Sequence, residues 1–231
     1  MPDPTPPSPR NKLLAGLPSG ALMRLWPRFR PVQLAFGDAV QVAGAPISTV
    51  LFLESGFASV VVTLENGDQV EVAQIGAEGI LGTALVLGRG HFGFDSVMQC
   101  AGSGLAIEAE SLREAMEESP VLRQRLLGYA QAKMRQIAQI AACNSRHPTE
   151  QRLARWLLMA HDRAGTTQFA ITHDMLSMML GMRRAGVTIA AGRLQEAGVI
   201  RYGRGRLEIV NRAGLEKVVC ECYRVIDPKE G

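Results

Sequence analysis

The chain has 231 residues, enough for one or two compact domains, and its 47% hydrophobic content is ample for packed cores. The 20% of charged residues and the formal net charge of +3 are ordinary, and no apolar run reaches the roughly 18 residues of a membrane span. The proline-rich start, MPDPTPPSPR, has no apolar signal core, so we expect a cytoplasmic protein in which residues 1–11 form a disordered arm.

The basic residues are unevenly distributed along the chain. Residues 146–212 hold eleven arginines against five acidic residues, a net charge of +6, whereas residues 1–145 have a net charge of −2. A basic C-terminal third on a slightly acidic body is typical of a nucleic-acid-binding module. The alternative is a generally arginine-rich composition, because lysine is scarce throughout the chain.

Residues from about Phe29 to Ile107 follow the period of two that is typical of β-strands. The segment FASVVVTLENGDQVEVAQI is the clearest case, because alternating apolar residues flank Asn66-Gly67, a pair that favours a tight hairpin. Glycines recur at short intervals through this region. Many short strands with frequent turns predict an antiparallel barrel or roll.

Helical spacing begins near Ser111, where Ser111 and Glu114 form a capping-box pattern for a short helix. Pro120 then suits the first turn of a helix of about 24 residues with a mostly apolar stripe. Such a helix between two domains has nothing of its own to cover the stripe, so we expect it to pair with its copy in a second subunit. Packing on its own barrel is the alternative. The predicted dimerisation residues are Leu122, Leu126, Ala130, Met134, Ile137 and Ala141.

The segment from Ile171 to Val210 predicts two short helices joined by a glycine turn and followed by a hairpin. Thr172 is a good N-cap for a helix over residues 173–180, and Gly181 supplies backbone freedom in the turn. A second helix follows over about 184–197, and a Gly/Arg-rich wing over 200–209. This order is typical of a winged helix-turn-helix.

The outward face of the second helix carries Arg184, which suits a bidentate contact to guanine. Thr188 on the same face suits a base edge or a phosphate, and Ile189 suits a thymine methyl group. Each arginine alone is more simply a solvated charge, but arginines gathered on two exposed tips of one module favour DNA. We expect the remaining contacts to be with phosphates, from Thr172, Arg183, Arg204 and Arg206.

The order of a glycine-rich roll, a long helix and this module resembles the Crp–Fnr family of bacterial transcription regulators. The spacing that carries the resemblance involves Thr172, Leu176, Gly181, Arg184, Val187, Leu194 and Gly198-Val199-Ile200. It implies an α+β fold with a cyclic-nucleotide-binding-like β-roll (12–118), a dimerisation helix (119–146) and a winged helix-turn-helix (147–231). It also implies a homodimer on a two-fold symmetric site in double-stranded DNA, with RNA polymerase as a further partner of an activator.

Two departures from the family pattern concern DNA reading and effector binding. Where family members commonly have Ser/Thr-Arg-Glu, this chain has Arg183-Arg184-Ala185, so the family's usual half-site does not carry over. In the roll, residues 76–82 resemble the ribose-binding part of a cyclic-nucleotide site. The Arg-Ser/Thr-Ala part is replaced by Gly93-Phe94-Asp95, which disfavours a cyclic phosphate. The candidate effector-binding residues are Glu78, Gly79 and Arg89, and the effector is unknown.

The four cysteines do not have the spacing of a metal-ligand framework. They are Cys100, Cys143, Cys220 and Cys222. The Cys220-x-Cys222 pair could be redox-active or bind metal, but a reduced pair is the simpler interpretation, so we expect no metal and no cofactor. Iron–sulfur sensing would need an N-terminal cysteine cluster, and no cysteine precedes Cys100. No triad, P-loop or HExxH pattern indicates an enzyme.

The sequence therefore predicts a dimeric, sequence-specific transcription regulator. The alternative is a ligand-sensing β-roll module that regulates a partner protein rather than DNA. DNA affinity with a steep salt dependence separates the two hypotheses. Activation and repression are not distinguished by these patterns.

Overall fold

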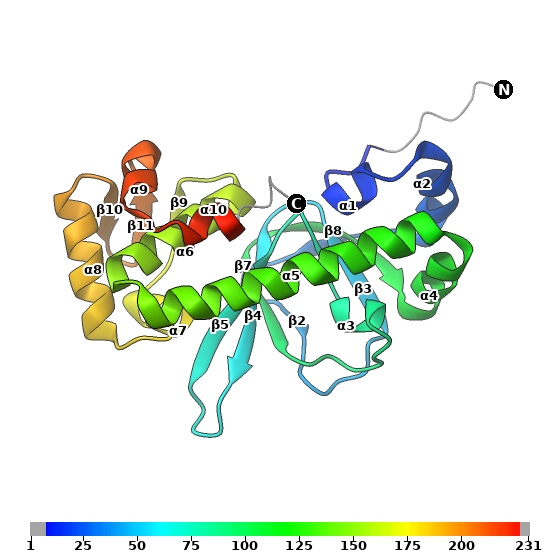
Figure 1. Ribbon diagram of the computed structural model, residues 1–231, viewed down its shortest axis with the longest axis horizontal. Helices are drawn as coiled ribbons and strands as arrows, with labels where there is room; N and C mark the ends of the chain where they lie inside the picture. Colours follow the sequence, from blue (N-terminus) through cyan, green and yellow to red (C-terminus); the bar gives the residue numbers. More distant parts are fainter. Residues whose placement is uncertain (1–7, 227–231) are drawn as a thin grey trace. The chain divides into compact units, whose positions relative to one another are not determined.

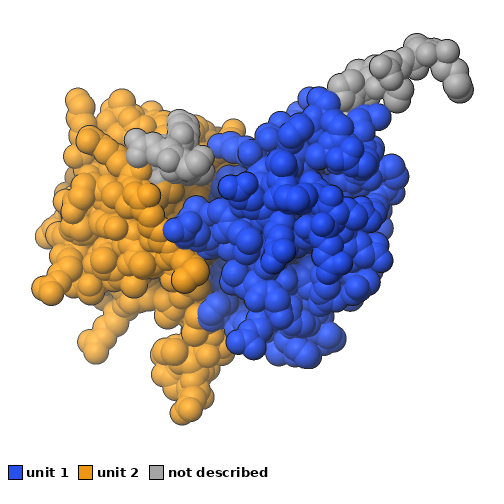
Figure 2. Space-filling view, turned by 45° about the vertical axis from the view of Figure 1, so that its right-hand side comes forward, with its two compact units in different colours: residues 1–60, 75–133 blue, residues 61–74, 134–231 orange. Residues whose placement is uncertain are grey.

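The computed structural model describes residues 8–226, which divide into two compact units. Of the described residues, unit 1 contains 8–60 and 75–133, and unit 2 contains 61–74 and 134–226 (Figure 2). Among the helices of residues 8–226, none combines the length and the apolar character needed to cross a membrane. Most of the predicted disordered arm, residues 1–7, lies outside the described residues.

The predicted boundary of that arm at residue 11 is wrong, because Asn11 is fully buried in unit 1. Its side-chain amide donates to the carbonyl oxygens of Leu53 (2.9 Å) and Gly79 (2.8 Å). Its side-chain oxygen accepts from the backbone amides of Leu13 and Leu14 and so caps helix α1 (Lys12–Ala15). The Asn11 side chain therefore forms hydrogen bonds with backbone groups of α1, of the strand that ends at Leu53, and of the turn at Gly79.

We expect Asn11→Ala to destabilise the protein by about 2–4 kcal/mol, because it removes an N-cap and leaves buried carbonyl groups without a donor. Denaturant unfolding of the full chain measures this loss. The control is Asn66→Ala, which removes an exposed asparagine that bonds Asp68 in the hairpin turn and should cost less than about 1 kcal/mol. Equal losses for the two variants would contradict the role given to Asn11.

Two four-stranded antiparallel sheets form the β-roll, with strand orders β1-β8-β3-β6 and β2-β7-β4-β5 (Figure 1). The strands are β1 (Arg30–Leu34), β2 (Ala39–Gln41), β3 (Thr49–Leu53), β4 (Phe57–Thr63), β5 (Gln69–Ile75), β6 (Ile80–Leu81), β7 (Asp95–Cys100) and β8 (Gly102–Glu108). The short helices of this unit are α1, α2 (Ser19–Leu25), the 3-10 helix η1 (Trp26–Arg28), α3 (Thr83–Val86) and α4 (Ala109–Glu118). Phe52, Ile80 and Ile107 belong to the core that the first sheet shares with these helices.

The predicted hairpin is confirmed, since β4 and β5 flank Asn66 and Gly67, and Gly67 has a positive φ of 87°. The predicted capping box is wrong. Helix α4 begins at Ala109, two residues before Ser111, and no side chain caps it. Its first amide instead donates to the carbonyl oxygen of Ser48 at 2.9 Å, so a neighbouring segment takes the place of a local cap.

Helix α5 (Pro120–Arg146) is the predicted long helix, but its apolar stripe is divided between two faces. Leu122 and Leu126 belong to the core of unit 1, and Ala130 is also buried, so these three residues pack within their own subunit. Ile137 is half-buried. Of the predicted dimerisation residues, only Met134 and Ala141 are exposed.

A different face of α5 is open to solvent between residues 127 and 141. Its apolar residues are Leu127, Met134, Ala138 and Ala141. Their spacings of seven, four and three residues place them on one outward stripe of the helix. Met134 is the most exposed large residue of the set, at 65%.

Unit 2 contains the elements predicted for a winged helix-turn-helix. They are α6 (Thr149–Ala164), β9 (Gln168–Ala170), α7 (His173–Leu180), α8 (Arg184–Glu196), β10 (Ile200–Gly203), β11 (Arg206–Ile209), α9 (Arg212–Val218) and α10 (Cys222–Ile226). The wing is a three-stranded sheet of order β10-β11-β9, whose third strand the sequence analysis missed. The hydrophobic core of this unit includes Leu153, Leu157, Leu176 and Leu194.

Candidate DNA-binding surface

A tight turn joins helices α7 and α8, and one face of α8 is exposed to solvent. Thr172 caps α7, its Oγ1 accepting from the Met175 amide at 3.2 Å. Gly181 ends α7 in the left-handed conformation, with φ of 57°. Helix α8 then buries one face, formed by Val187, Ala190, Ala191 and Leu194. Its packing against α6 and α7 leaves the opposite face of α8 in solvent.

The exposed face of α8 carries Arg184, Thr188 and Ile189. Ile189 is 60% exposed although it is a large apolar side chain. A large apolar side chain at this position suits an interface that excludes water. Arg183 precedes the helix and provides no side-chain cap, so its charge also extends into solvent.

Two neighbouring residues of α7 hold these side chains in place. The Nε atom of Arg184 lies 3.3 Å from the Oδ1 atom of Asp174, which leaves the two terminal nitrogens of the guanidinium for another acceptor. The Thr188 hydroxyl bonds His173 Nδ1 and the carbonyl oxygen of Arg184, each at 3.1 Å. Thr188 is therefore exposed, but its hydroxyl already has partners within the protein.

His173 connects this helix pair to the wing. Its ring stacks on Tyr202 of β10, with ring centroids 4.5 Å apart and planes 9° apart. The Tyr202 hydroxyl donates to the Ile171 carbonyl oxygen at 3.1 Å, and burial raises the pKa of this hydroxyl. The sequence analysis missed Asp174, His173 and Tyr202, because only the fold brings their side chains to the α8 face.

The wing ends in a two-residue turn formed by Arg204 and Gly205. Both have positive φ angles, 51° and 72°, between the paired residues Gly203 and Arg206. Two positive φ values match the type I′ turn that suits a two-residue hairpin. Arg204 is the one non-glycine residue with a positive φ in the described part of the chain, and the turn places its side chain at the tip.

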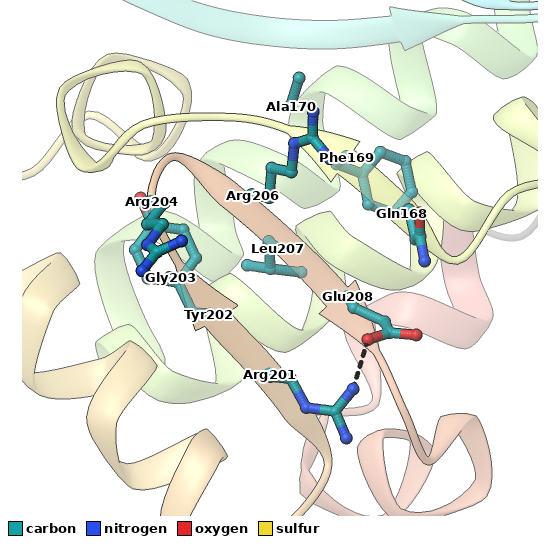
Figure 3. Close-up of a pocket in the computed structure, with 10 residues that line it drawn as sticks. All are labelled: Gln168, Phe169, Ala170, Arg201, Tyr202, Gly203, Arg204, Arg206, Leu207 and Glu208. Carbon is teal, nitrogen blue, oxygen red and sulfur yellow. Dashed lines mark hydrogen bonds and ion pairs between the residues drawn. The ribbon is translucent and has the colours of Figure 1, made fainter.

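The arginines of the wing differ in their partners. Arg201 pairs across the strands with Glu208 at 2.8 Å. No ion pair engages Arg183, Arg204 or Arg206 anywhere within residues 8–226, so these charges are available to phosphates. Figure 3 shows the hairpin arginines around an open hollow on the wing sheet, bordered also by Phe169, Ala170 and Tyr202.

A family model for the Crp-like helix-turn-helix domain matches residues 151–218. This chain contains a Crp-like helix-turn-helix domain. The match covers α6 through α9, so it includes the helix pair, the wing and every arginine described above. Comparison with curated protein sequences gave no match.

Solved structures share the fold along most of the chain. FixK2 from Bradyrhizobium japonicum has a TM-score of 0.70 at 16% identity, covering 83% of this chain and 98% of its own. A putative Crp/Fnr-family regulator from Eubacterium rectale has a TM-score of 0.69 at 16% identity, covering 90% and 97%. The c-di-GMP-responsive regulator CLP from Xanthomonas campestris has a TM-score of 0.68 at 13% identity, covering 83% and 99%.

The chain thus combines a Crp-like helix-turn-helix domain with the β-roll and long helix of Crp/Fnr-family regulators. The family model assigns the helix-turn-helix domain, and the solved structures show the fold of the chain.

The candidate effector residues lie in unit 1. Glu78 is mostly buried, accepts from the Gly76 amide at 3.1 Å, and has its Oε1 atom 4.0 Å from the Lys133 ammonium. A Cβ atom at Gly79 would collide with the Tyr129 side chain, which fills the space beside this glycine. Arg89 is exposed in the turn after α3. Asp95 accepts from the Ala43 amide at 2.8 Å.

A second group of chemically reactive side chains lies in unit 2, away from the candidate DNA-binding residues in sequence. Cys143, His147, Cys220 and Cys222 place their ligand atoms within 4.8 Å of one another. Burial raises the pKa of the Cys143 thiol, and raises that of Cys220 to about 12. The sequence analysis considered only the Cys220-x-Cys222 pair. The i, i+4 spacing of Cys143 and His147 on one helix was the signal that could have extended it.

Proposed function

We propose that the protein acts in the cytoplasm as a homodimer that binds a two-fold symmetric DNA site. Helix α8 enters the major groove, and the wing contacts the phosphate backbone. The observation that carries this proposal is that one domain exposes basic residues at two separate sites. One is the N-terminal end of α8 with Arg184 and Ile189, and the other is the wing turn with Arg204 and Arg206.

In this proposal Arg184 reads a base. Asp174 engages only its Nε atom, so the terminal nitrogens are free to donate to guanine O6 and N7. Ile189 one turn further along the helix contacts a thymine methyl group. Thr172, Arg183, Arg204 and Arg206 contact phosphates and position the helix. Thr188 supports Arg184 and His173 in addition to any contact with DNA.

The outward stripe of α5 forms the dimer interface. It is apolar and distinct from the face that packs within the subunit, and a second copy related by a two-fold axis covers it in the manner of a coiled coil. Leu127, Met134, Ala138 and Ala141 are the central contacts. Two α8 helices then address half-sites about one helical turn apart.

The effector is not a simple cyclic nucleotide in this proposal. Lys133 lies near Glu78, the Tyr129 side chain fills the space beside Gly79, and Asp95 occupies the segment that would hold a phosphate. We therefore expect cyclic nucleotides to leave DNA binding unchanged. Binding of RNA polymerase follows only for an activator.

Selection of bound sequences from a random pool of duplex DNA tests the proposal, using the purified full-length protein without added ligand. We expect an enriched palindrome whose half-sites lie about one helical turn apart. Enrichment of a single asymmetric site would contradict the symmetric dimer. No enrichment, with and without an extract of cell metabolites, together with an affinity that does not fall with salt would support a protein partner instead of DNA.

A separate prediction concerns the contact of the wing residue Arg204 with DNA phosphate. Arg204→Asn should weaken binding to all sequences alike and reduce the slope of log affinity against log salt by about 2 for the dimer, one phosphate contact per subunit. Asparagine tolerates the positive φ at this position, so the turn is kept. Fluorescence anisotropy over a salt series measures both effects. Arg204→Lys keeps the charge and should retain the wild-type slope; a changed preference at one base pair in Arg204→Asn would instead indicate base reading.

A further inference from the structure

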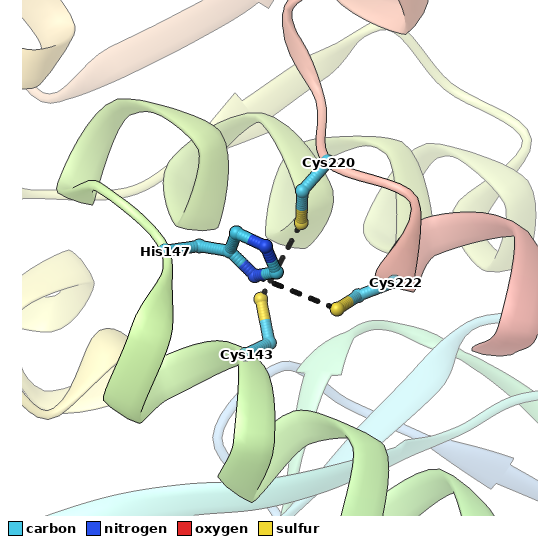
Figure 4. Close-up of side chains that lie close together, drawn as sticks. All are labelled: Cys143, His147, Cys220 and Cys222. Carbon is cyan, nitrogen blue, oxygen red and sulfur yellow. Dashed lines mark hydrogen bonds between the residues drawn. The ribbon is translucent and has the colours of Figure 1, made fainter.

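The cluster of Cys143, His147, Cys220 and Cys222 joins two segments of unit 2 that are far apart in sequence (Figure 4). Cys143 lies in the last turn of α5, and His147 follows that helix at i+4, on the same side. Cys220 lies between α9 and α10, and Cys222 begins α10. The three cysteines are buried and His147 is half-buried, so the group is largely shielded from water.

Two distances within the cluster match the edges of a tetrahedral site around one metal ion, and all four ligand atoms lie within 4.8 Å of one another. The Sγ atoms of Cys143 and Cys220 are 3.6 Å apart, and Cys222 Sγ lies 3.5 Å from His147 Nδ1. In a tetrahedral zinc site, bond lengths of about 2.3 Å to sulfur and about 2.0–2.1 Å to nitrogen give S···S and S···N edges of about 3.8 and about 3.6 Å. Both measured distances lie close to these edges. A disulfide would need about 2.05 Å between the sulfurs.

The surroundings of the cluster supply the outer contacts of a metal site. The second ring nitrogen of His147, Nε2, lies 3.3 Å from the Glu221 carboxylate, an arrangement that orients a ligating imidazole. Gln139 Nε2 donates to Cys222 Sγ at 3.0 Å. The buried Arg155 donates to the Oδ1 atom of Asn144, the residue after Cys143, at 3.0 Å, so a positive charge lies beside this end of α5.

We propose that Cys143, His147, Cys220 and Cys222 bind one Zn²⁺ ion per chain in a closed tetrahedral S₃N site. Three thiolates and one imidazole are the ligands of structural zinc, whereas calcium and magnesium require oxygen ligands. Three thiolates with Zn²⁺ leave one negative charge, which Arg155 offsets. The ion ties the segment after α9 to the end of α5, and so stabilises the unit that carries the recognition helix. This replaces the sequence-based expectation of no metal site.

Titration of the reduced, metal-stripped, untagged full-length protein with Co²⁺ tests the site. We expect the visible absorption of tetrahedral Co²⁺ and sulfur-to-cobalt charge transfer, with an end point at one ion per chain and loss of both signals when Zn²⁺ is added. Cys222→Ser should weaken Co²⁺ binding by about 100-fold or more. The matched control is Cys100→Ser, which changes the cysteine of β7 and should bind Co²⁺ as the wild type does.

Glu221→Gln keeps the proposal testable if Cys222→Ser fails to fold. Glu221 is exposed, so the variant should fold, yet loss of the contact to His147 should weaken metal binding by about tenfold. An octahedral Co²⁺ spectrum, or equal affinity in the wild type and in folded Cys222→Ser, would overturn the proposal. So would a Cys143–Cys220 disulfide in the protein as isolated, detected by mass spectrometry, because it removes two ligands.

Discussion

Met134→Glu should convert the protein to a monomer of 25.0 kDa, half the mass of the wild-type species, in sedimentation equilibrium. Met134 is 65% exposed on the outward stripe of α5, so the change leaves the core of the subunit intact. In a symmetric dimer the two new carboxylates lie on the same apolar interface, where each is desolvated and repelled by the other. Loss of the linked second half-site should weaken binding to a palindromic site by about 10²–10⁴-fold.

A matched variant separates charge from position. Ala132→Glu adds the same charge to an exposed residue of α5 that lies off the stripe, two residues before Met134, and should remain dimeric. Leu127 lies on the stripe about two helical turns before Met134, so Leu127→Glu should repeat the effect of Met134→Glu. A dimer that persists in both stripe variants would place the interface on another surface of the protein.

The fold followed closely from the sequence where periodicity and turn chemistry agree. The Asn66-Gly67 hairpin, the start of the long helix at Pro120 and the Thr172 cap each depend on local physics. Strand β9 was missed because three residues carry no period. The arm was misjudged at Asn11, whose bonds to Leu53 and Gly79 depend on segments distant in sequence.

The dimer stripe and the cysteine cluster show a second limit of sequence patterns. The spacing of apolar residues in α5 predicts that they share a face of the helix, but it does not predict what packs against that face. Leu122 and Leu126 pack in the core of their own subunit. The sequence separation of Cys143 and Cys220 likewise does not predict that their side chains are close in space, because the elements α6 to α9 lie between them in the chain. The positions of Arg184 and Arg204 were predictable because each lies at a local feature, a helix start or a turn, whereas their contacts with DNA stay a prediction.

The second large effect is expected at Arg184. Arg184→Ala should cost about 1–3 kcal/mol per half-site on the selected palindrome, because a bidentate contact to guanine is lost. The two subunits act together, so the dimer should lose about 2–6 kcal/mol, or about 30-fold to 10⁴-fold in affinity. Preference should relax at one symmetric pair of positions only. Repeating the selection with the variant measures that preference, and anisotropy measures the affinity.

Two control variants in α8 test whether the effect of Arg184→Ala is due to base reading. Arg193→Ala removes an equal charge from α8, but Arg193 lies in the last turn and pairs with Glu150 at 3.4 Å, so its loss should cost less than about 1 kcal/mol. Arg184→Lys keeps the charge without the planar fork and should retain general affinity while losing base preference. If Arg184→Ala instead weakened every sequence equally, Arg184 would be a phosphate contact, and base reading would fall to Ile189 and its neighbours on the exposed face of α8.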